Sequence, residues 1–294
     1  MTVNWKQAGR IGVWASDFRF GDEGFVTEAA AELEELGYGA LWFPGGRGGD
    51  LLARIDLILD ATQRCVVATG ILNVWMHEPA EVGAWWRDLD PGRRQRVMLG
   101  LGVGHAPSIG EAWRQPLTKM AEYLDSLDAE GVPGDHRCIA ALGPKMLDLA
   151  KEHSAGAHPY LVPPQHTAGA RERLGQTAWL APEQGVILDS DPASARRKAR
   201  EQLATYAQLP NYRNSWQRLG FSESDIDTMD DRFIDALFAW GSSEQIAARL
   251  TEHLRAGADH VCLQAVLGST GTSDPATLQK SWRELAPSRL GIEA

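Results

Sequence analysis

The chain has 294 residues, of which 44% are hydrophobic and 23% are charged, the composition of an ordinary globular protein. A formal net charge of −10 excludes the basic face needed to bind nucleic-acid phosphates, so we expect no nucleic-acid partner and a small-molecule substrate instead. No apolar run approaches the ~18 residues of a membrane span and the first residues lack the apolar core of a signal peptide, so we expect a soluble, cytoplasmic protein without membrane association.

Short apolar segments alternate with longer amphipathic segments along the chain, a rhythm typical of repeated βα units. Eight segments are predicted to be strands, and each is followed by a segment with helical periodicity. Eight units in a chain only slightly longer than the ~250 residues of such folds predict an α/β fold, a (β/α)8 TIM barrel, in preference to a doubly wound open sheet. The predicted strands are residues 11–16, 40–43, 65–74, 96–103, 138–142, 157–162, 185–190 and 259–266.

The interval between the seventh and eighth predicted strands is longer than the others. It contains two helical patterns, residues 192–208 and 227–256, joined by the stretch LPNYRNSWQRLGFSESDIDTMDD. In a barrel, a loop that follows a strand belongs to the face that carries the active site. We therefore predict one domain over residues 1–294, with a helical insertion at about residues 191–243 as a candidate lid.

The stretch LGLGVGHAP ends the fourth predicted strand. Its glycines, Gly100, Gly102 and Gly104, lack the GxGxxG spacing of a dinucleotide loop, and Pro107 interrupts any helix that begins there. Glycines at alternate positions of a strand share one face, so we interpret them as a ligand-facing edge at the mouth of the barrel. The alternative, that they relieve crowding between barrel layers, stays open for Gly100 and is weaker for Gly104.

Another glycine, Gly70, lies inside the third predicted strand and precedes the β-branched Ile71. A glycine within a strand marks a bulge or a close approach by another molecule. This is therefore a place to look for strained backbone, including a non-proline cis peptide bond. A plain buried strand is the commoner case and stays the alternative.

At the end of the fifth predicted strand, Gly143, Pro144 and Lys145 form a helix start. Proline suits the first helical turn, and the exposed amides together with the lysine favour an anion. This pattern predicts a phosphate site, with an ordinary helix start and a solvated lysine as the alternative.

Histidines and tryptophans follow several predicted strands. His77, His105 and His158 are of this kind, and a lone histidine is more often a structural residue than a catalytic one. His105 stands out because barrels place catalytic groups at the carboxyl ends of strands. The tryptophans expected to wall an apolar pocket are Trp14, Trp42, Trp75 and Trp113.

Other catalytic classes find no support in the sequence. Cys65, Cys138 and Cys262 lie far apart, with no CxxC pair and no histidine cluster at ligand spacing, so we expect neither a metal site nor a disulfide framework. No GxSxG elbow, HExxH motif or Ser-His-Asp order occurs, which leaves hydrolase chemistry unsupported.

Four stretches taken together resemble a known family. In chain order they are NVWMHEPAE, LDPGRRQRVMLGLGVGHAP, RQPLTKMAEYLDSLDAEGVP and AALGPKMLDLAKEHSAGAHPYL, and the likeness spans nearly the whole chain. They are similar to the bacterial-luciferase-like flavin and deazaflavin oxidoreductases. The stretches GPKMLDLAKEHSAGAHPYLVPPQHT, LPNYRNSWQRLGF and AGADHVCLQ most resemble the actinobacterial branch that uses coenzyme F420.

The resemblance implies a barrel that binds a flavin-type ring across the strand ends, with coenzyme F420 as the cofactor and FMN as the alternative. In that family a bulge ending strand three backs the ring, and the glycine-rich end of strand four lies beside it. A helix start holds the phosphate, and the end of strand six completes the wall. Here the corresponding positions are Gly70, Ile71, Leu72 and Asn73, then Gly102 and Gly104, then Leu142, Gly143 and Pro144 with the adjacent Lys145, then Pro159 and Tyr160 of the stretch 159–162.

Two positions depart from the family pattern. After the second predicted strand many relatives carry an acidic residue followed by histidine, whereas this chain has Gly45, Gly46 and Arg47. Sugar-phosphate dehydrogenase relatives have a glutamate where His105 stands. Neither the acid–base chemistry of those relatives nor their substrates can therefore be carried over.

We expect an F420-dependent oxidoreductase that transfers a hydride between the coenzyme and a small organic substrate. His105, or less favourably His77, would handle a proton, because the unperturbed pKa of histidine lies near 6.5. Trp14, Trp75 and Arg47, together with the insertion after the seventh predicted strand, would line the substrate pocket. The runner-up is an FMN-dependent luciferase-like monooxygenase, and the third possibility is a cofactor-free, non-catalytic barrel.

Two further expectations concern partners. The acidic tail of F420 would be favoured by a basic side chain near the mouth, such as Arg47, Lys145 or Lys119. The resemblance also implies a homodimer formed through helices near strands two and three.

Overall fold

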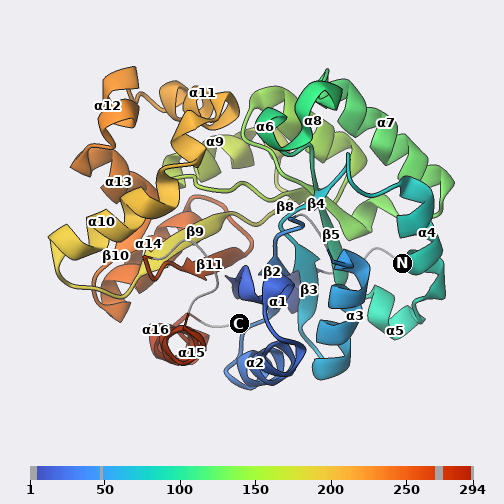
Figure 1. Cartoon of the computed structure of the whole chain (residues 1–294), viewed down its shortest axis with the longest axis horizontal. Coiled ribbons are helices and arrows are strands. Elements are labelled where there is room, and N and C mark those ends of the chain that lie inside the picture. The colour runs from blue at the N-terminus through green and yellow to red at the C-terminus, as the bar shows by residue number, and fades with distance from the viewer. Residues whose placement is uncertain (1–4, 47–48, 269–273, 293–294) are drawn as a thin grey trace.

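Parallel strands form the centre of the molecule, and helices surround them (Figure 1). The computed structural model describes residues 5–46, 49–268 and 274–292. Within these residues eleven strands belong to one sheet, and every pairing is parallel. The strands are β1 (Ile11–Trp14), β2 (Ala40–Phe43), β3 (Val66–Thr69), β4 (Leu72–Asn73), β5 (Val97–Gly102), β6 (Arg137–Ile139), β7 (Gly156–Ala157), β8 (Trp179–Leu180), β9 (Glu183–Ile187), β10 (Phe238–Trp240) and β11 (Val261–Ala265).

The strand order closes the sheet into a barrel. β1 pairs with β2 on one side and β11 on the other, and pairing continues from β2 through β3, β5, β6 and β7 to β8. Only Ala181 and Pro182 separate β8 from β9, and β9 pairs with β11. Residues 179–187 therefore act as one barrel strand that joins both ends of the order. The predicted (β/α)8 barrel is confirmed, with β4 extending the third barrel strand and β10 added beside β9.

Helices cover the outside of this barrel (Figure 1). Side chains cap the starts of several of them: Asp50 accepts a hydrogen bond from the amide of Ala53 at the start of α3, and Asp191 accepts one from Ala193 at the start of α10. In the described part of the chain, no helix has the length and apolar character needed to cross a membrane. The helices are α1 (Asp17–Phe20), α2 (Glu23–Glu35), α3 (Leu51–Ala61), α4 (Pro79–Asp88), α5 (Pro91–Arg94), α6 (Ala106–Ile109), α7 (Pro116–Ala129), α8 (Pro144–His153), α9 (Pro164–Leu174), α10 (Pro192–Leu203), α11 (Pro210–Arg218), α12 (Glu223–Thr228), α13 (Asp231–Leu237), α14 (Ser243–Arg255), α15 (Pro275–Glu284) and α16 (Pro287–Leu290), with 3-10 turns η1 (Trp5–Ala8), η2 (Gly110–Ala112), η3 (Gly134–His136) and η4 (Tyr206–Gln208).

Strand boundaries differ from the predicted ones mainly in the second half of the chain. The seventh barrel strand covers residues 179–187, whereas residues 185–190 were predicted. The prediction missed its first part because Pro182 interrupts the apolar run there. The sixth is only two residues long, because Leu161 turns the chain into the left-handed region with a φ of 54°. β10 was not predicted, since Phe238–Trp240 lies inside the pattern interpreted as helix 227–256.

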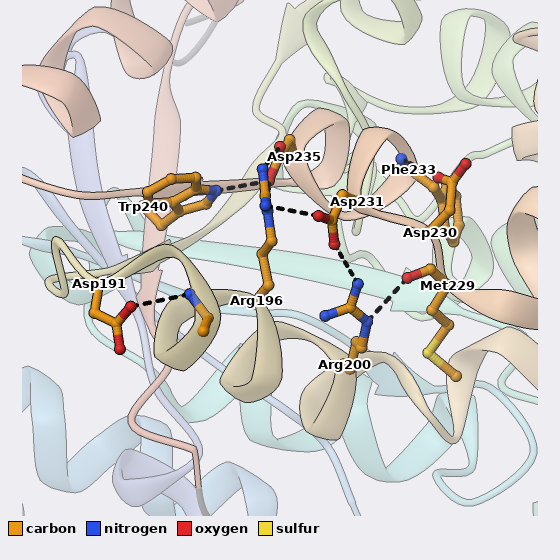
Figure 2. A network of polar contacts seen from close by, with 10 residues as sticks. Asp191, Arg196, Arg200, Met229, Asp230, Asp231, Phe233, Asp235 and Trp240 are labelled. Atoms are coloured by element: carbon orange, nitrogen blue, oxygen red, sulfur yellow. Dashed lines mark hydrogen bonds and ion pairs between the residues drawn. The ribbon is translucent and has the colours of Figure 1, made fainter.

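The elements α10 to α13 and β10 lie between β9 and α14, in the region expected to form an insertion. Figure 2 shows the ion pairs that join α10 to α13. Arg196 contacts Asp231 and Asp235 at 2.7 and 2.6 Å, and Arg200 contacts Asp231 at 2.6 Å. The indole N–H of Trp240 donates to Asp235 at 2.8 Å. These contacts fix the arrangement of the insertion at its polar edge.

Apolar packing on the other side of the insertion forms a cluster of its own, distinct from the cluster between barrel and helices. Its centre is Trp216, whose ring meets that of Phe233 edge-on at 5.0 Å. The indole N–H of Trp216 donates to the carbonyl of Leu161 at 3.0 Å, after the sixth barrel strand. The insertion is therefore fastened to the carboxyl ends of the barrel strands.

Large aromatic side chains fill the interior of the barrel. Trp5, Trp14, Trp42 and Trp179 belong to one interior cluster, and Trp42 stacks on Trp179 with ring centroids 5.7 Å apart. Trp42, predicted to wall a pocket, is fully buried there because β2 directs it into the barrel. The interior below the strand ends is thus packed with side chains.

Candidate active site

A cavity of about 580 Å³ opens at the carboxyl ends of the barrel strands. It is lined by the residues that end or follow β1, β2, β3, β5, β6 and β7, together with residues of η4 and α11 from the insertion. In barrels this end carries the loops that position ligands and catalytic groups, and the volume is within the usual range of small-molecule sites. The cavity is therefore the candidate active site.

We call Gly70, Ile71, Asn73, Gly102 and Gly104 the floor of the cavity, and all five line it. The peptide bond between Gly70 and Ile71 is cis. The unusual backbone to which the sequence pointed is therefore present, and a plain strand is the wrong description of this segment.

At Gly102 and Gly104 of the floor, the absence of a side chain leaves space for the side chains of Ile71 and Asn73. A Cβ on Gly102 would lie 2.6 Å from Cγ1 of Ile71, and a Cβ on Gly104 would lie 2.4 Å from Nδ2 of Asn73. At Gly100 a Cβ would come within 1.8 Å of a backbone oxygen of β3. Gly102 and Gly104 also line the cavity, so their interpretation as a ligand-facing edge stays a prediction. They seat the segment that joins β3 to β4, and that segment then lines the cavity.

The helix start expected to hold a phosphate lies at one end of the cavity. Leu142 and Gly143 line it, whereas Pro144 and Lys145 are exposed and do not, because side chains of a first helical turn project away from its amides. The cation that does line the cavity is Arg218 of α11, whose guanidinium donates to the carbonyl of Leu142 at 3.2 Å. An anion at this end would meet the amides of α8 and this guanidinium together.

Four aromatic side chains, Trp14, Tyr160, Tyr206 and Tyr212, form the wall of the cavity. Successive ring centroids along this series are 5.5, 5.4 and 5.2 Å apart. The hydroxyl of Tyr160 donates to Oε1 of Gln264 at 2.7 Å. Burial raises the pKa of all three tyrosines, so the wall stays uncharged.

His105 follows β5 and lines the cavity beside the wall, with its ring centroid 5.7 Å from that of Tyr212. Burial holds the pKa of His105 below its ordinary value, and a hydrogen bond with Asn211 opposes part of this shift. The buried Nδ1 of the ring has no hydrogen-bond partner among the described residues. The imidazole is therefore neutral at pH 7 and has a nitrogen free to exchange a proton.

Trp75, expected in the substrate pocket, does not line the cavity. Its indole N–H donates to the carbonyl of Val103 at 3.0 Å, and the ring lies under the ammonium of Lys119. Trp113 donates to the same carbonyl at 3.1 Å and does line the cavity. Of the tryptophans expected at the pocket, Trp14 and Trp113 thus line the cavity. The ammonium of Lys119 lies over the rings of Trp75 and Tyr123 and does not line the cavity.

Three other predicted residues are also absent from the lining of the cavity. Leu72 is fully buried against the outer helices, because alternate residues of a strand face opposite sides. His77 lies beyond β4, on the turn that leads into α4, and Pro159 contributes its carbonyl to the ladder with Glu183 at 2.8 Å. Arg47 lies outside the described residues.

The insertion is expected from the sequence to line the pocket beside Trp14 and Trp75, and residues of this region do line the cavity. The sequence did not identify which of them, because the stretch LPNYRNSWQRLGF was interpreted only as typical of one branch of a family. Its polar and aromatic side chains supply the missing part of the lining. The lining residues from this region are Tyr206, Asn211, Tyr212, Asn214 and Arg218.

Comparison with protein families decides the relationship of the chain. The family described as luciferase-like monooxygenase matches residues 15–130 and 132–260. The chain belongs to the luciferase-like monooxygenase family. The match includes the floor, His105 and the tyrosines of the wall, and no curated protein matches the sequence.

Solved structures with the same fold include members with different cofactors. An F420-dependent secondary alcohol dehydrogenase, solved with an F420–acetone adduct, is 16% identical with a TM-score of 0.69, covering 98% of this chain and 99% of the other. The F420-dependent tetrahydromethanopterin reductase of Methanopyrus kandleri is 15% identical, with a TM-score of 0.70 and coverage of 95% and 99%. A type II Baeyer–Villiger monooxygenase from Pseudomonas putida, solved with FMN, is 13% identical, with a TM-score of 0.68 and coverage of 97% and 98%. At these identities the likeness establishes the luciferase-like fold and leaves the choice of cofactor open.

Proposed function

We propose that this luciferase-like protein is an F420-dependent oxidoreductase that transfers a hydride between the deazaflavin and a small organic substrate. The observation that carries the proposal is the form of the cavity. Its floor is backbone, glycine and two side chains, and it is bordered by an aromatic wall. The amides of α8 and the guanidinium of Arg218 lie at one end. These residues fit a flat ring that carries an anionic tail.

When bound, F420 would supply a ring carbon that accepts or gives a hydride. In the direction of substrate oxidation, His105 would take the proton from a substrate hydroxyl while the adjacent carbon loses its hydride. The substrate then loses two electrons and two hydrogens, one as hydride and one as the proton held by His105. In the reverse direction the protonated imidazole returns that proton to the carbonyl oxygen. The tyrosines of the wall exclude water from the reacting atoms.

Binding titrations of the purified protein with F420 and with FMN test the cofactor. We expect tight binding of F420 and weak or no binding of FMN. Tight FMN binding without affinity for F420 would replace the proposal by an FMN-dependent monooxygenase. A protein that takes neither would be a non-catalytic barrel, with its cavity used for another ligand.

The role of His105 is tested by replacing it with alanine. We expect His105→Ala to lower kcat about 10²-fold or more, because a positioned acid–base group contributes this much, with the dissociation constant of F420 changed less than about threefold. Hydride transfer can be followed by the absorbance of the coenzyme with a panel of small alcohols and carbonyl compounds. His77→Ala is the matched control, because His77 does not line the cavity, and it should leave both constants unchanged. Equal turnover of the His105 variant and the wild type would remove the assignment.

We also propose that the protein is a cytoplasmic homodimer that associates through α3 and α4. The indole N–H of Trp85 on α4 donates to Asp56 on α3 at 3.1 Å, so the two helices present a common surface. The three cysteines are free and buried, as is usual in a reducing compartment. Sedimentation equilibrium should give twice the mass of the chain, and a mass equal to one chain would contradict the dimer.

A further inference from the structure

His158 follows β7 and is almost completely buried, with 1% of its surface exposed, yet it lines the cavity. Its ring stacks on Trp42 with centroids 4.3 Å apart, which fixes the plane of the imidazole. Nδ1 lies 2.7 Å from the carbonyl oxygen of Ala181. A carbonyl can only accept, so Nδ1 carries the hydrogen and donates it.

The other ring nitrogen of His158 is consequently a lone-pair acceptor. Nε2 is buried and has no hydrogen-bond partner among the described residues. It faces Gly70 of the floor, where a Cβ would lie only 2.9 Å away. Burial lowers the pKa of His158 to about 4, so the imidazole stays neutral at pH 7 and Nε2 can only accept.

Neighbouring protein groups cannot satisfy this acceptor. The indole N–H of Trp14 faces the same point beside Gly70, but it already donates to the carbonyl of Gly70 at 3.2 Å. A buried acceptor left without a donor is unfavourable, and native structures usually pair such groups. The donor expected at this position must therefore arrive in the cavity.

Two other buried histidines show how the molecule treats an imidazole that has only a structural role. In His260, Nδ1 lies 2.9 Å from the carbonyl of Gly9, and Nε2 accepts from the indole N–H of Trp42 at 3.2 Å. In His253, Nδ1 pairs with Thr167 at 2.8 Å and Nε2 with Gln184 at 2.9 Å. Neither of these two rings lines the cavity. His166 also leaves a buried nitrogen, Nδ1, unpaired outside the cavity, whereas the unpaired nitrogen of His158 is found where a ligand can reach it.

We propose that His158 determines ligand specificity by accepting, at Nε2, a hydrogen bond from the imide N–H of a flat, neutral ring bound on the floor. The proposal rests on the proposed function and adds the orientation of the ring, whose pyrimidine edge enters the cavity first. Flavin and deazaflavin rings both carry this N–H between two carbonyls, in the oxidised and the reduced state. A ring without a donor at that edge leaves Nε2 unpaired and binds more weakly.

Two substitutions separate the two nitrogens of the ring. In His158→Asn the amide nitrogen takes the place of Nδ1 and keeps the donor to Ala181, but the acceptor at Nε2 is lost. In His158→Gln the amide oxygen reaches the place of Nε2 and restores the acceptor. With F420 and FMN as probes, we expect the asparagine variant to bind the preferred cofactor about tenfold or more weakly. The glutamine variant should stay within about threefold of the wild type. His253→Asn is the matched control, because both of its ring nitrogens pair outside the cavity, and it should lower Tm and leave both dissociation constants unchanged.

A second readout follows Nε2 itself through its ¹⁵N resonance in histidine-labelled protein, titrated with F420, FMN and uracil as a small imide probe. We expect an unprotonated nitrogen whose resonance moves upfield when the probe donates to it. Failure of F420 and FMN to bind, with a shift on adding uracil, would overturn the proposed function and leave the acceptor role of His158 intact. The proposal is overturned if none of the three probes shifts the resonance, or if the asparagine variant binds as well as the glutamine variant. A water that keeps Nε2 paired in every state would give that unshifted resonance.

Discussion

Backbone and glycine make the floor of the cavity, whereas side chains from a separate cluster make most of its wall. On the floor, a single added carbon at Gly102 or Gly104 would collide with a neighbouring residue. In the wall, Tyr206 and Tyr212 belong to the insertion, which is fastened by partly exposed ion pairs and by the hydrogen bond from Trp216 to Leu161. The floor is thus determined by steric exclusion and the wall by contacts that can be exchanged.

This difference separates two tasks within one site. A rigid floor defines which shape of ligand can bind, since packed interiors deform little. A wall supplied by an insertion can change the chemistry without rebuilding the barrel. Three experiments would break or sharpen it.

The largest effect should be that of pH on the free energy of unfolding, because several titratable groups are buried in the barrel and against its helices. Burial lowers the pKa of His158 and His260 to about 4 and that of His253 to about 3, whereas it raises the pKa of Glu183 to about 8. Between about pH 4.5 and 6.5 the unfolded chain therefore binds more histidine protons than the folded chain, and the one glutamate proton that the folded chain keeps offsets only part of this difference. The free energy of unfolding should consequently rise with pH over this range.

Above pH 6.5 the histidines are neutral in both states, and only Glu183 still contributes. Its folded pKa is the higher one, so the free energy of unfolding should fall as the pH rises toward 8, which places the maximum near pH 6.5. Urea unfolding between pH 5 and 8 measures this curve. Glu183→Gln should abolish the decline above pH 6.5, and a variant that kept the decline would show that another group causes it.

The next largest effect should follow Gly102→Ala. The added Cβ would lie 2.6 Å from Cγ1 of Ile71, and overpacking of this kind lowers the free energy of unfolding by about 1–3 kcal/mol. Because Ile71 must shift, we also expect the preferred cofactor to bind at least tenfold more weakly in fluorescence titrations. Gly169→Ala, on an exposed position with no atom within 4 Å of the new Cβ, should leave binding unchanged. Normal affinity in the Gly102 variant would mean that the floor is less rigid than its contacts indicate.

The smallest of the three effects should come from Trp216→Phe in the wall. The substitution keeps an aromatic ring but leaves the buried carbonyl of Leu161 without its donor, which should lower stability by about 1–2 kcal/mol. Since Tyr206 and Tyr212 belong to the same cluster as Trp216, and the rings of Tyr212 and Trp216 lie 5.5 Å apart, the cofactor should bind severalfold more weakly. Trp240→Phe removes a comparable indole bond, to Asp235 at the polar edge, and should leave binding unaltered. Identical titration curves for both variants would argue that the wall does not depend on this anchor.

Periodicity along the chain was sufficient to predict the barrel, because each buried parallel strand forms a continuous apolar run with a helix after it. It was insufficient where local chemistry overrides that signal. Pro182 interrupts the apolar pattern of the seventh strand, so its first part was not predicted. The strand β10 has only three residues, too few to be distinguished from the helical pattern around it. Such boundaries are decided by pairing across the sheet, which a single sequence does not display.

The floor of the site could be predicted because glycine within a strand is conspicuous and has few explanations. The wall could not be predicted. Its residues Tyr206 and Tyr212, like Arg218, belong to amphipathic segments, and the sequence pattern does not distinguish them from the other polar and aromatic side chains of those segments. Likewise, the free nitrogen of His158 depends on where Ala181 and Trp42 place the ring. His158 was noticed as a strand-end histidine, but its partners become visible only when the barrel closes.

The contact between Ile71 and Gly102 also bears on how the cavity could be redesigned. The two positions share one fixed volume, so a side chain gained at 102 has to be balanced by one lost at 71. In homologous chains the sizes of these two residues should therefore vary inversely. To enlarge the cavity, residue 71 should be replaced by one with a smaller side chain and Gly102 should be kept, because the volume released at position 71 then becomes available to a ligand.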